Sequence, residues 1–421
     1  MSCKNCKSQN LNKIIKIGKQ PISSHFYSTK KYKLPSYSLD LYKCHNCELV
    51  QLKSIPKLDK MYGLNYGYRT SLSPLMIKHM KNKYLRINNF FNNKKKYNIL
   101  DIGSNDGTFL NFFSKKKNIK LFAIDPSAKK FRKNYNKKIN LIINYFKKEL
   151  IVKKYKQKKK FDTITSFAMF YDIVNPNKFC KDIYKLLSDN GKWILELSYF
   201  PTLLKNLTYD QICHEHVTYY TLTTFEKIIK KNGLKILDFS LNNINGGSIE
   251  IVCSKTKSNF RPKLKKILKQ KKFENKINKL SYEKFNQRIE NIKKKLKFIL
   301  KNNKSKVIGY GASTKGNIVL NHCKINNKDL KYICDANTYK YNRYTPGSNI
   351  KIISKKKMRK LKPKILLVLI WSFRKEVISQ EMKFIKKGGK LLFHLPKVHM
   401  VDKNNYKKFF NSNFKKLSYK I

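Results

Sequence analysis

Residues 97–108 read YNILDIGSNDGT, an apolar run of the β type that breaks into a polar turn with two glycines. A helical pattern begins at Phe109, directly after this turn. Glycine lets the backbone approach a ligand closely, and doubly wound α/β sheets bind cofactors at such turns, beyond the carboxyl ends of parallel strands. We therefore expect cofactor contacts from four residues in and around the turn: Asp101, Gly103, Asn105 and Gly107.

A second apolar run, residues 120–124, ends at Asp125. A carboxylate there is placed to accept hydrogen bonds from both hydroxyls of a ribose. The two glycines of the first turn lack the Gly-x-Gly-x-x-Gly spacing of pyrophosphate binders, which favours a nucleoside cofactor without phosphates, such as S-adenosylmethionine. Strand, helix and strand patterns continue at 161–165, 177–187 and 191–196, and the whole resembles the class I methyltransferase sheet. A Rossmann-type domain with a structural role is the alternative.

Two Cys-x-x-Cys pairs lie near the N-terminus, Cys3 with Cys6 and Cys44 with Cys47. Four thiolates complete the tetrahedral shell that structural zinc prefers, and they leave no open position for catalysis. Because the interval between the pairs exceeds that of a usual zinc ribbon, we expect an inserted β layer that includes residues 39–42. The sequence thus predicts one structural zinc ion, with incidental cysteines as the alternative.

The composition bounds the class of protein. With 421 residues, of which 41% are hydrophobic and 13% aromatic, the chain is long enough for about two to four globular domains. The formal net charge of +69 favours a nucleic-acid partner, yet only eight of the 94 basic residues are arginines. Lysine, asparagine and isoleucine share A/T-rich codons, so a biased genome accounts for the excess. We expect a lysine-solvated surface and no nucleic-acid partner.

No membrane association is expected from the sequence. The longest apolar run, residues 365–371, has seven residues, far below the roughly 18 that cross a bilayer. The first six residues lack the apolar core of a secretory signal, so we expect a cytoplasmic protein whose thiols stay reduced. The oligomeric state stays open.

A dense polar cluster follows the strand pattern at 191–196 and contains Cys213, His214, Glu215, His216, Tyr219 and Tyr220. Two histidines and a carboxylate together favour acid/base chemistry, because an imidazole with a pKa of about 6.5 can accept a proton at neutral pH. The His-Glu-x-x-His spacing of metalloproteases is absent. A surface loop and a second metal site are the alternatives.

Several segments resemble the sugar-nucleotide C-methyltransferases, namely residues 166–172, 196–199, 209–220 and 245–249. The paired cysteines resemble the zinc-binding N-terminal domain of that family, and residues 308–317 resemble the opening of its C-terminal domain. The resemblance covers nearly the whole chain. Its most specific element is the string CHEHVTYY, which ends at Tyr220.

The resemblance implies methyl transfer from S-adenosylmethionine to a ring carbon beside the ketone of a nucleotide-linked 4-keto-deoxysugar. A carbon becomes nucleophilic only after a proton α to a carbonyl is removed, so the site needs a base near the sugar. His216 matches the base of the family. Glu215 and His214 would orient or buffer this base, and Tyr219 would line the sugar pocket. The resulting enolate attacks the methyl group in line, which requires positioning rather than metal assistance.

A second strand, turn and helix pattern follows a lysine-rich helical stretch at 274–301. Thr314 stands where the dinucleotide fingerprint has its third glycine, which disfavours a bound NAD, and a Walker loop is excluded. The backbone amides of this turn, with Ser313 and Lys315, are candidates for holding a sugar-nucleotide pyrophosphate. A packing role is the alternative.

Three further residues are substrate-binding candidates. Tyr68 and Arg69 are placed to stack a base and contact phosphate, unless the segment is a turn with ordinary core tyrosines. Asn245 lies in a turn that shapes the pocket or simply closes a hairpin. The predicted architecture is an α/β chain in three parts: a zinc-binding domain at 1–68, a class I methyltransferase domain at 69–258, and a helical linker with a C-terminal Rossmann-like domain at 259–421.

Two other functions stay open. An O-methyltransferase of a nucleotide sugar or glycan precursor would keep the fold and the cofactor. Attack through an enolate should wash solvent deuterium into the α position of the sugar, whereas attack by oxygen should not. A basic nucleic-acid-binding or RNA-modifying protein would instead bind tightly, with an affinity that falls steeply with salt.

Overall fold

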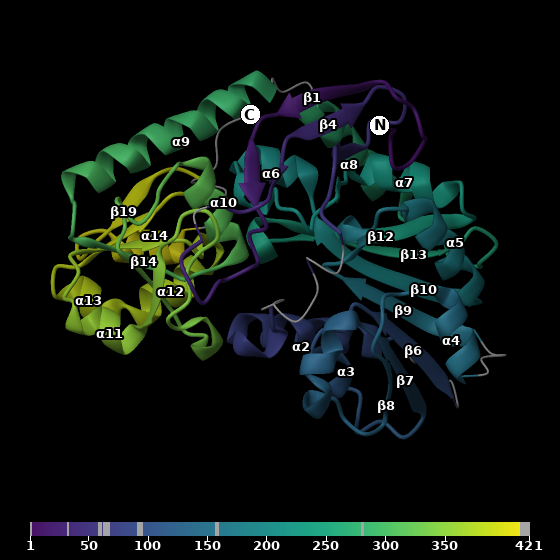
Figure 1. Cartoon of the computed structure of the whole chain (residues 1–421). Coiled ribbons are helices and arrows are strands. Elements are labelled where there is room, and N and C mark those ends of the chain that lie inside the picture. The colour runs from purple at the N-terminus through teal and green to yellow at the C-terminus, as the bar shows by residue number, and fades with distance from the viewer. Residues whose placement is uncertain are drawn as a thin grey trace.

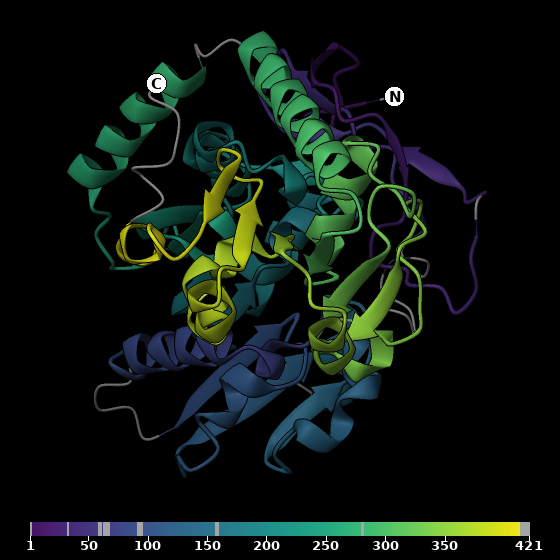
Figure 2. The same ribbon diagram turned by 90° about the vertical axis from the view of Figure 1, so that its left-hand side faces the viewer.

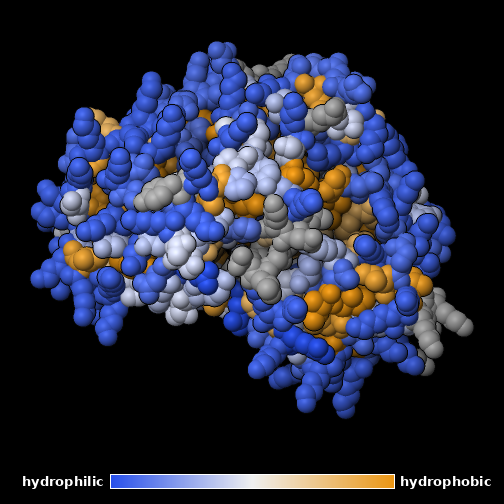
Figure 3. Space-filling view, viewed as in Figure 1, coloured by the Kyte–Doolittle hydropathy of each residue, from blue (hydrophilic) through white to orange (hydrophobic). Residues whose placement is uncertain are grey.

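The protein is described by a computed structural model for residues 2–31, 33–57, 61, 68–90, 96–155, 160–278 and 282–412. Among these residues the main sheets have four, seven and six strands. In Figure 1 the N-terminal segment (purple) crosses the top, the central sheet lies to the right and the C-terminal sheet to the left. The surface on this side is mostly hydrophilic (Figure 3), as the excess of lysine predicts.

The central sheet fixes the position of the glycine turn. Its order is β12-β13-β10-β9-β6-β7-β8, and all pairs are parallel except those of β13 with β10 and β12. From β6 the chain adds β7 and β8 on one side, whereas β9 and β10 lie on the other side of β6. The ligand crevice of a doubly wound sheet opens beyond the two strands at such a switch point, here β6 and β9. The strands are β6 (Tyr97–Ile102), β7 (Ile119–Ile124), β8 (Ile139–Ile142), β9 (Phe161–Phe167), β10 (Leu187–Ser198), β12 (Leu234–Asn242) and β13 (Ser248–Lys255).

Short polar residues set the starts of the covering helices. Ser73 and Asn175 accept hydrogen bonds from backbone N–H groups one turn ahead, and a proline follows each of them. A side-chain cap followed by proline is the favoured start of a helix. The helices of this part are α2 (Pro74–Asn88), α3 (Thr108–Asn111), α4 (Lys148–Tyr155), α5 (Pro176–Leu186), α6 (Phe200–Asn206) and α7 (Leu222–Lys230).

The N-terminal sheet is antiparallel and takes one strand from the central part of the chain. Its order is β1-β4-β5-β11, and its strands are β1 (Leu11–Ile15), β4 (Leu41–Cys44), β5 (Val50–Leu52) and β11 (Thr218–Tyr219). A separate pair joins β2 (Lys19–Pro21) to β3 (Ser36–Ser38). The expected β layer between the cysteine pairs is therefore present. Strand β11 joins this layer directly after the polar cluster of residues 213–216.

The C-terminal sheet has the order β16-β15-β14-β17-β18-β19, parallel except for its last strand. Its strands are β14 (Val307–Tyr310), β15 (Tyr332–Asp335), β16 (Lys351–Ser354), β17 (Ile365–Val368), β18 (Lys390–Phe393) and β19 (His399–Val401). Helices α8 (Leu264–Asn278) and α9 (Tyr282–Asn302) precede it. Helices α10 (Thr314–His322), α11 (Lys355–Lys360), α12 (Arg374–Gln380), α13 (Met382–Lys386) and α14 (Tyr406–Asn411) complete it. Figure 2 shows its strands (yellow) above helix α2 (dark blue).

The helical patterns are confirmed, although their lengths differ from a simple reading. The helical stretch expected over 274–301 contains the end of α8 and most of α9. The helical pattern expected from Phe109 is the single turn α3, because the chain beyond Asn111 tightens into hydrogen bonds between residues three apart. Among the described residues, no helix combines the length and apolar character needed to cross a membrane.

Candidate functional site

A cavity of about 310 Å³ lies beyond the carboxyl ends of β6, β7 and β9. Its apolar walls include Met76, Met80, Phe109 and Met169. Six residues predicted for cofactor or substrate contacts also line it: Asp101, Gly103, Asn105, Asp125, Tyr68 and Asn245. The structure therefore brings together sequence segments that lie more than 170 positions apart, at the point where a doubly wound sheet binds its ligand.

The glycine turn packs tightly against the residues around it and is hydrogen-bonded to them. Gly103 and Gly107 both have a φ of +77°, and a Cβ at Gly103 would lie 2.9 Å from Met169. The Asn105 backbone N–H donates to Asp125 at 2.8 Å, and the Asn105 side chain accepts from the Thr70 backbone N–H at 3.0 Å. Gly107 does not line the cavity. It starts helix α3, and a Cβ there would lie 2.9 Å from the ring of Tyr135.

Two carboxyl groups face this cavity from adjacent strand ends. Burial raises the pKa of Asp101 to about 7, although Thr165 opposes this shift by donating a hydrogen bond at 2.7 Å. Burial also raises the pKa of Asp125, whose second oxygen accepts from the backbone N–H of Ser127. These oxygens can accept hydrogen bonds from hydroxyl and ammonium groups of a ligand.

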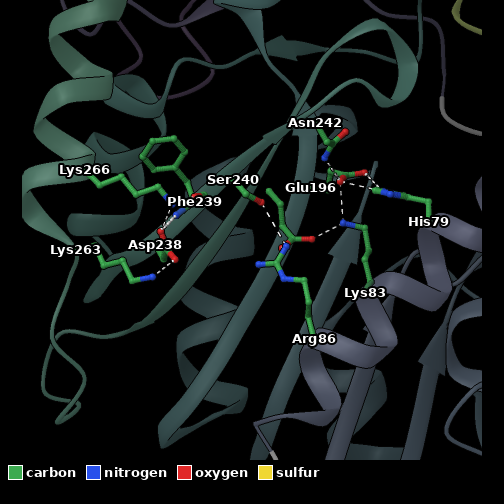
Figure 4. A network of polar contacts seen from close by, with 11 residues as sticks. His79, Lys83, Arg86, Glu196, Asp238, Phe239, Ser240, Asn242, Lys263 and Lys266 are labelled. Atoms are coloured by element: carbon green, nitrogen blue, oxygen red, sulfur yellow. Dashed lines mark hydrogen bonds and ion pairs between the residues drawn. The ribbon is translucent and has the colours of Figure 1, made fainter. Parts of the chain in front are cut away.

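Glu196, near the end of β10, also lines the cavity, and the sequence analysis did not select it as a site residue. Figure 4 shows His79 and Lys83 of α2 reaching toward it. His79 Nε2 lies 3.0 Å from its Oε1, Lys83 donates at 2.8 Å and Asn242 at 2.7 Å. Burial alone would raise the pKa of Glu196, but the charge of Lys83 and the contact with His79 lower it to about 2. The carboxylate is therefore ionised at neutral pH.

The polar cluster of residues 213–216 lies beside the cavity without lining it. The ring of His216 packs on that of Tyr171 at a centroid distance of 4.1 Å, and the next residue, Asp172, lines the cavity. Burial and then the charge of Lys315 lower the pKa of His216 to about 3. Both carboxylate oxygens of Glu215 are buried and have no partner among the described residues.

His214 and Tyr219 complete this cluster. His214 contacts the backbone oxygen of Gln20 at 3.2 Å and packs edge-on against Tyr37, so it faces the N-terminal part. Burial lowers the pKa of His214 and raises that of Tyr219. The Tyr219 hydroxyl is buried and lacks a partner in the described part of the chain.

The remaining candidates are engaged with the protein. Arg69 lies 3.6 Å from Asp106 and does not line the cavity. Ser313 caps α10 by accepting a hydrogen bond from the backbone N–H of Gly316 at 2.9 Å. Lys315 donates to the backbone oxygen of Asn245 at 3.4 Å, which joins the C-terminal part to the rim of the cavity.

The four predicted zinc ligands come together, with all sulfur atoms within 4.8 Å of one another. Each Cys-x-x-Cys pair is followed by the same turn: Lys7 and Glu48 have a φ of 66°, and their backbone N–H groups donate to Cys3 and Cys44, respectively. Four convergent thiols on two matching turns fit the tetrahedral preference of zinc, and no open ligand position remains.

Comparison with known families divides the chain in the same order. Family models match a "Putative zinc binding domain" over residues 3–62, a "Methyltransferase domain" over 76–238 and a "C-methyltransferase C-terminal domain" over 243–396. The C-methyltransferase NovU of Streptomyces niveus is 25% identical over 237 residues, which are 55% of this chain and 56% of NovU. The match thus spans about half the length of that relative.

Solved methyltransferases show local likeness. An S-adenosylmethionine-dependent methyltransferase from Clostridium acetobutylicum is 16% identical over 42% of this chain and 91% of its own, with a TM-score of 0.31. The plantazolicin methyltransferase BpumL is 14% identical over 44% and 86%, with a TM-score of 0.33. The three family models thus match in series along most of the chain, and the Cys₄ cluster and the class I sheet agree with the first two of them, so the chain is similar to C-methyltransferases that carry an N-terminal zinc-binding domain.

Proposed function

We propose that the protein transfers a methyl group to a ring carbon beside the ketone of a nucleotide-linked 4-keto-deoxysugar. The observation that carries the proposal is the adjacency of the candidate base to the cofactor cavity. His216 packs on Tyr171, and Asp172 lines the cavity that the glycine turn shapes. The name of the relative NovU, a C-methyltransferase, supports carbon as the methylated atom.

The cavity is proposed to hold S-adenosylmethionine. Asp125 would accept from the ribose hydroxyls, and Asp101 would offer a second carboxyl group to the methionine end; both residues line the cavity. The sulphur-bearing and aromatic walls suit the apolar parts of the cofactor. When bound, S-adenosylmethionine supplies an electrophilic methyl group.

His216 is proposed to remove the α-proton of the ketosugar. Its lowered pKa keeps the imidazole neutral at physiological pH, so a ring nitrogen is free to accept a proton. Glu215, whose buried oxygens have no partner among the described residues, is proposed to orient or buffer this base. His214 would position the turn through its contact with Gln20, and Tyr219 would contact the sugar.

We propose that the nucleotide end of the acceptor lies at the rim of the cofactor cavity. Tyr68 and Asn245 line the cavity and are proposed to contact the sugar nucleotide. Arg69 is exposed enough to exchange Asp106 for a phosphate. Ser313 is bonded through both of its polar groups, because its hydroxyl caps α10 and its backbone N–H donates to Gly311 at 3.0 Å, so its proposed contact with the pyrophosphate requires one of these bonds to be exchanged.

The test is to incubate the pure protein with S-adenosylmethionine and a panel of 4-keto nucleotide sugars, and to analyse products by mass spectrometry and NMR. We expect one added methyl group on carbon and deuterium incorporation at the α position in heavy water. Transfer without any deuterium incorporation would favour the O-methyltransferase instead.

The variant His216→Ala should lose turnover while its affinity for S-adenosylmethionine, measured by calorimetry, stays within about threefold of wild type. Because His216 does not line the cofactor cavity, a parallel loss of cofactor affinity would point to collapse of the site. Full activity of the variant would remove His216 as the base.

A further inference from the structure

The C-terminal sheet has its own topological switch point, the place where a doubly wound sheet is expected to bind a ligand. The strands β15 and β16 lie on one side of β14, whereas β17 and β18 lie on its other side. In a doubly wound sheet this arrangement places the ligand site beyond the carboxyl ends of the two strands at the switch, here β14 and β17. Helix α10 follows β14, and the short helix η8 (Trp371–Phe373) follows β17. The turn between β14 and α10 is closed from within, because a Cβ at Gly311 would lie 2.6 Å from Ile370 and the Ala312 N–H donates to Asp335.

This switch point lies beside the rim of the cofactor cavity. Trp371 donates from Nε1 to Asp210 at 2.7 Å, and a Cβ at Gly246 would lie 2.8 Å from the Trp371 ring. Lys315, in the first turn of α10, donates to the backbone oxygen of Asn245, which lines the cavity. The switch point of the C-terminal sheet therefore contacts the rim of the cavity of the central sheet.

Lys315 is the cation at this meeting point. Within the described residues it makes one weak hydrogen bond, to Asn245 at 3.4 Å, and no ion pair. Burial lowers its pKa. Its positive charge adds to the effect of burial in lowering the pKa of His216, and it opposes burial at Asp210, whose pKa burial raises to about 6. An ammonium with spare donors thus lies at the rim of the cavity, and its charge acts on the candidate base.

Building on the proposed function, we infer that Lys315 binds the ketone oxygen of the acceptor and stabilises the negative charge that develops there. The α C–H bond breaks and its proton passes to His216. The electron pair of that bond forms the C=C bond of the enolate, while the carbonyl π pair moves to the oxygen that Lys315 contacts. When the new C–C bond forms, the C–S bond to the methyl group breaks and the carbonyl is restored.

A pyrophosphate at Lys315 fits the surroundings less well. Asp210, whose charge interacts with that of Lys315, has one buried oxygen that lacks a partner in the described part of the chain. A pyrophosphate beside this carboxylate would be repelled when Asp210 is ionised, whereas a ketone is neutral on binding and gains a single charge only in the transition state. A fixed cation aimed at developing charge is the arrangement that speeds the chemical step rather than binding.

The test compares Lys315→Met and Lys315→Gln with wild type on a ketosugar that the wild type methylates. Removing a preorganised donor to an oxyanion costs about 10²–10³ in kcat. We expect that loss with KM changed less than about threefold, and an equal loss in the rate of α-deuterium exchange measured by NMR with S-adenosylhomocysteine bound. Lys328→Met, an exposed lysine of the same part, is the control and should leave both rates unchanged.

The outcomes separate the inference from the proposed function. Wild type that methylates no ketosugar refutes the proposed function and this inference with it. Active wild type with Lys315 variants whose kcat stays within threefold overturns the inference alone. A rise in KM at constant kcat overturns it too, because uniform binding, as of a pyrophosphate, gives that pattern. Cofactor affinity equal to wild type shows that the variants are folded.

Discussion

Replacing Lys83 by methionine should destabilise the central part of the protein strongly. The Lys83 ammonium is 3% exposed and bridges two buried carboxylates, Glu196 at 2.8 Å and Glu250. Breaking a buried ion pair by removing one partner costs about 3–5 kcal/mol, because the other charge is left without compensation. Glu196 keeps His79 and Glu250 keeps Arg86, so we expect about 3 kcal/mol, the lower end of that range.

The loss of stability in Lys83→Met should depend on pH. The native contacts lower the pKa of Glu196 to about 2, so its ionised form contributes stability above the usual glutamate range, and that contribution is lost as the pH falls toward 2. In Lys83→Met burial is no longer opposed by the lysine charge, and the pKa of Glu196 should rise. The difference in free energy of unfolding between wild type and variant is therefore largest near pH 7 and shrinks below about pH 5.

Urea unfolding followed by tryptophan fluorescence measures this difference, since Trp193 is fully buried in β10. Lys81→Met is a matched control, because Lys81 is exposed on the same helix and should change the free energy of unfolding by less than about 0.5 kcal/mol. A loss below about 1 kcal/mol for Lys83→Met, or an equal loss at pH 7 and pH 4, would refute the reasoning.

Two other predictions concern the zinc module and the cofactor. Elemental analysis should find one zinc per chain, and Cys44→Ser should lower that content and the melting temperature together; a full-length protein that is stable without zinc would contradict the assignment. Asp125→Asn should weaken S-adenosylmethionine binding at least about tenfold in calorimetry while kcat at saturating cofactor changes much less, because Asp125 lines the cavity and His216 does not. Unchanged affinity would remove Asp125 from the cofactor site.

The strand before the glycine turn could be predicted from the sequence because the signal for it is local. The run at residues 97–102 and the glycine turn lie within one window of sequence, and the structure places a strand and a cavity there. Helix ends were harder: no start was predicted for α8, which begins at Leu264, ten residues before the helical stretch expected from Glu274. Tertiary contacts, rather than propensity, decide such boundaries.

The polar network of Glu196 could not have been found from the sequence. His79 and Lys83 lie more than 110 positions before their partner Glu196, and no local spacing relates them. One sequence signal could have indicated this network: Glu196 is a charged residue in an otherwise apolar strand, and a buried charge needs a partner. The same limit applies to Lys315, whose neighbours Asn245 and Asp210 lie 70 and 105 positions earlier in the sequence.

The zinc cluster is far in sequence from the candidate base, yet the backbone links them. Val217, directly after His216, donates to Tyr171 at 2.9 Å and accepts from Leu52 of β5 at 2.9 Å. Strand β5 begins three residues after Cys47, so the zinc turn, β5 and the His216 turn form one continuous hydrogen-bonded path. Zinc can therefore be required for activity without taking part in the chemistry. Chelation should then lower kcat with ketosugars before S-adenosylmethionine affinity falls, because no described residue that lines the cofactor cavity comes from residues 3–62, which the zinc-binding family model matches.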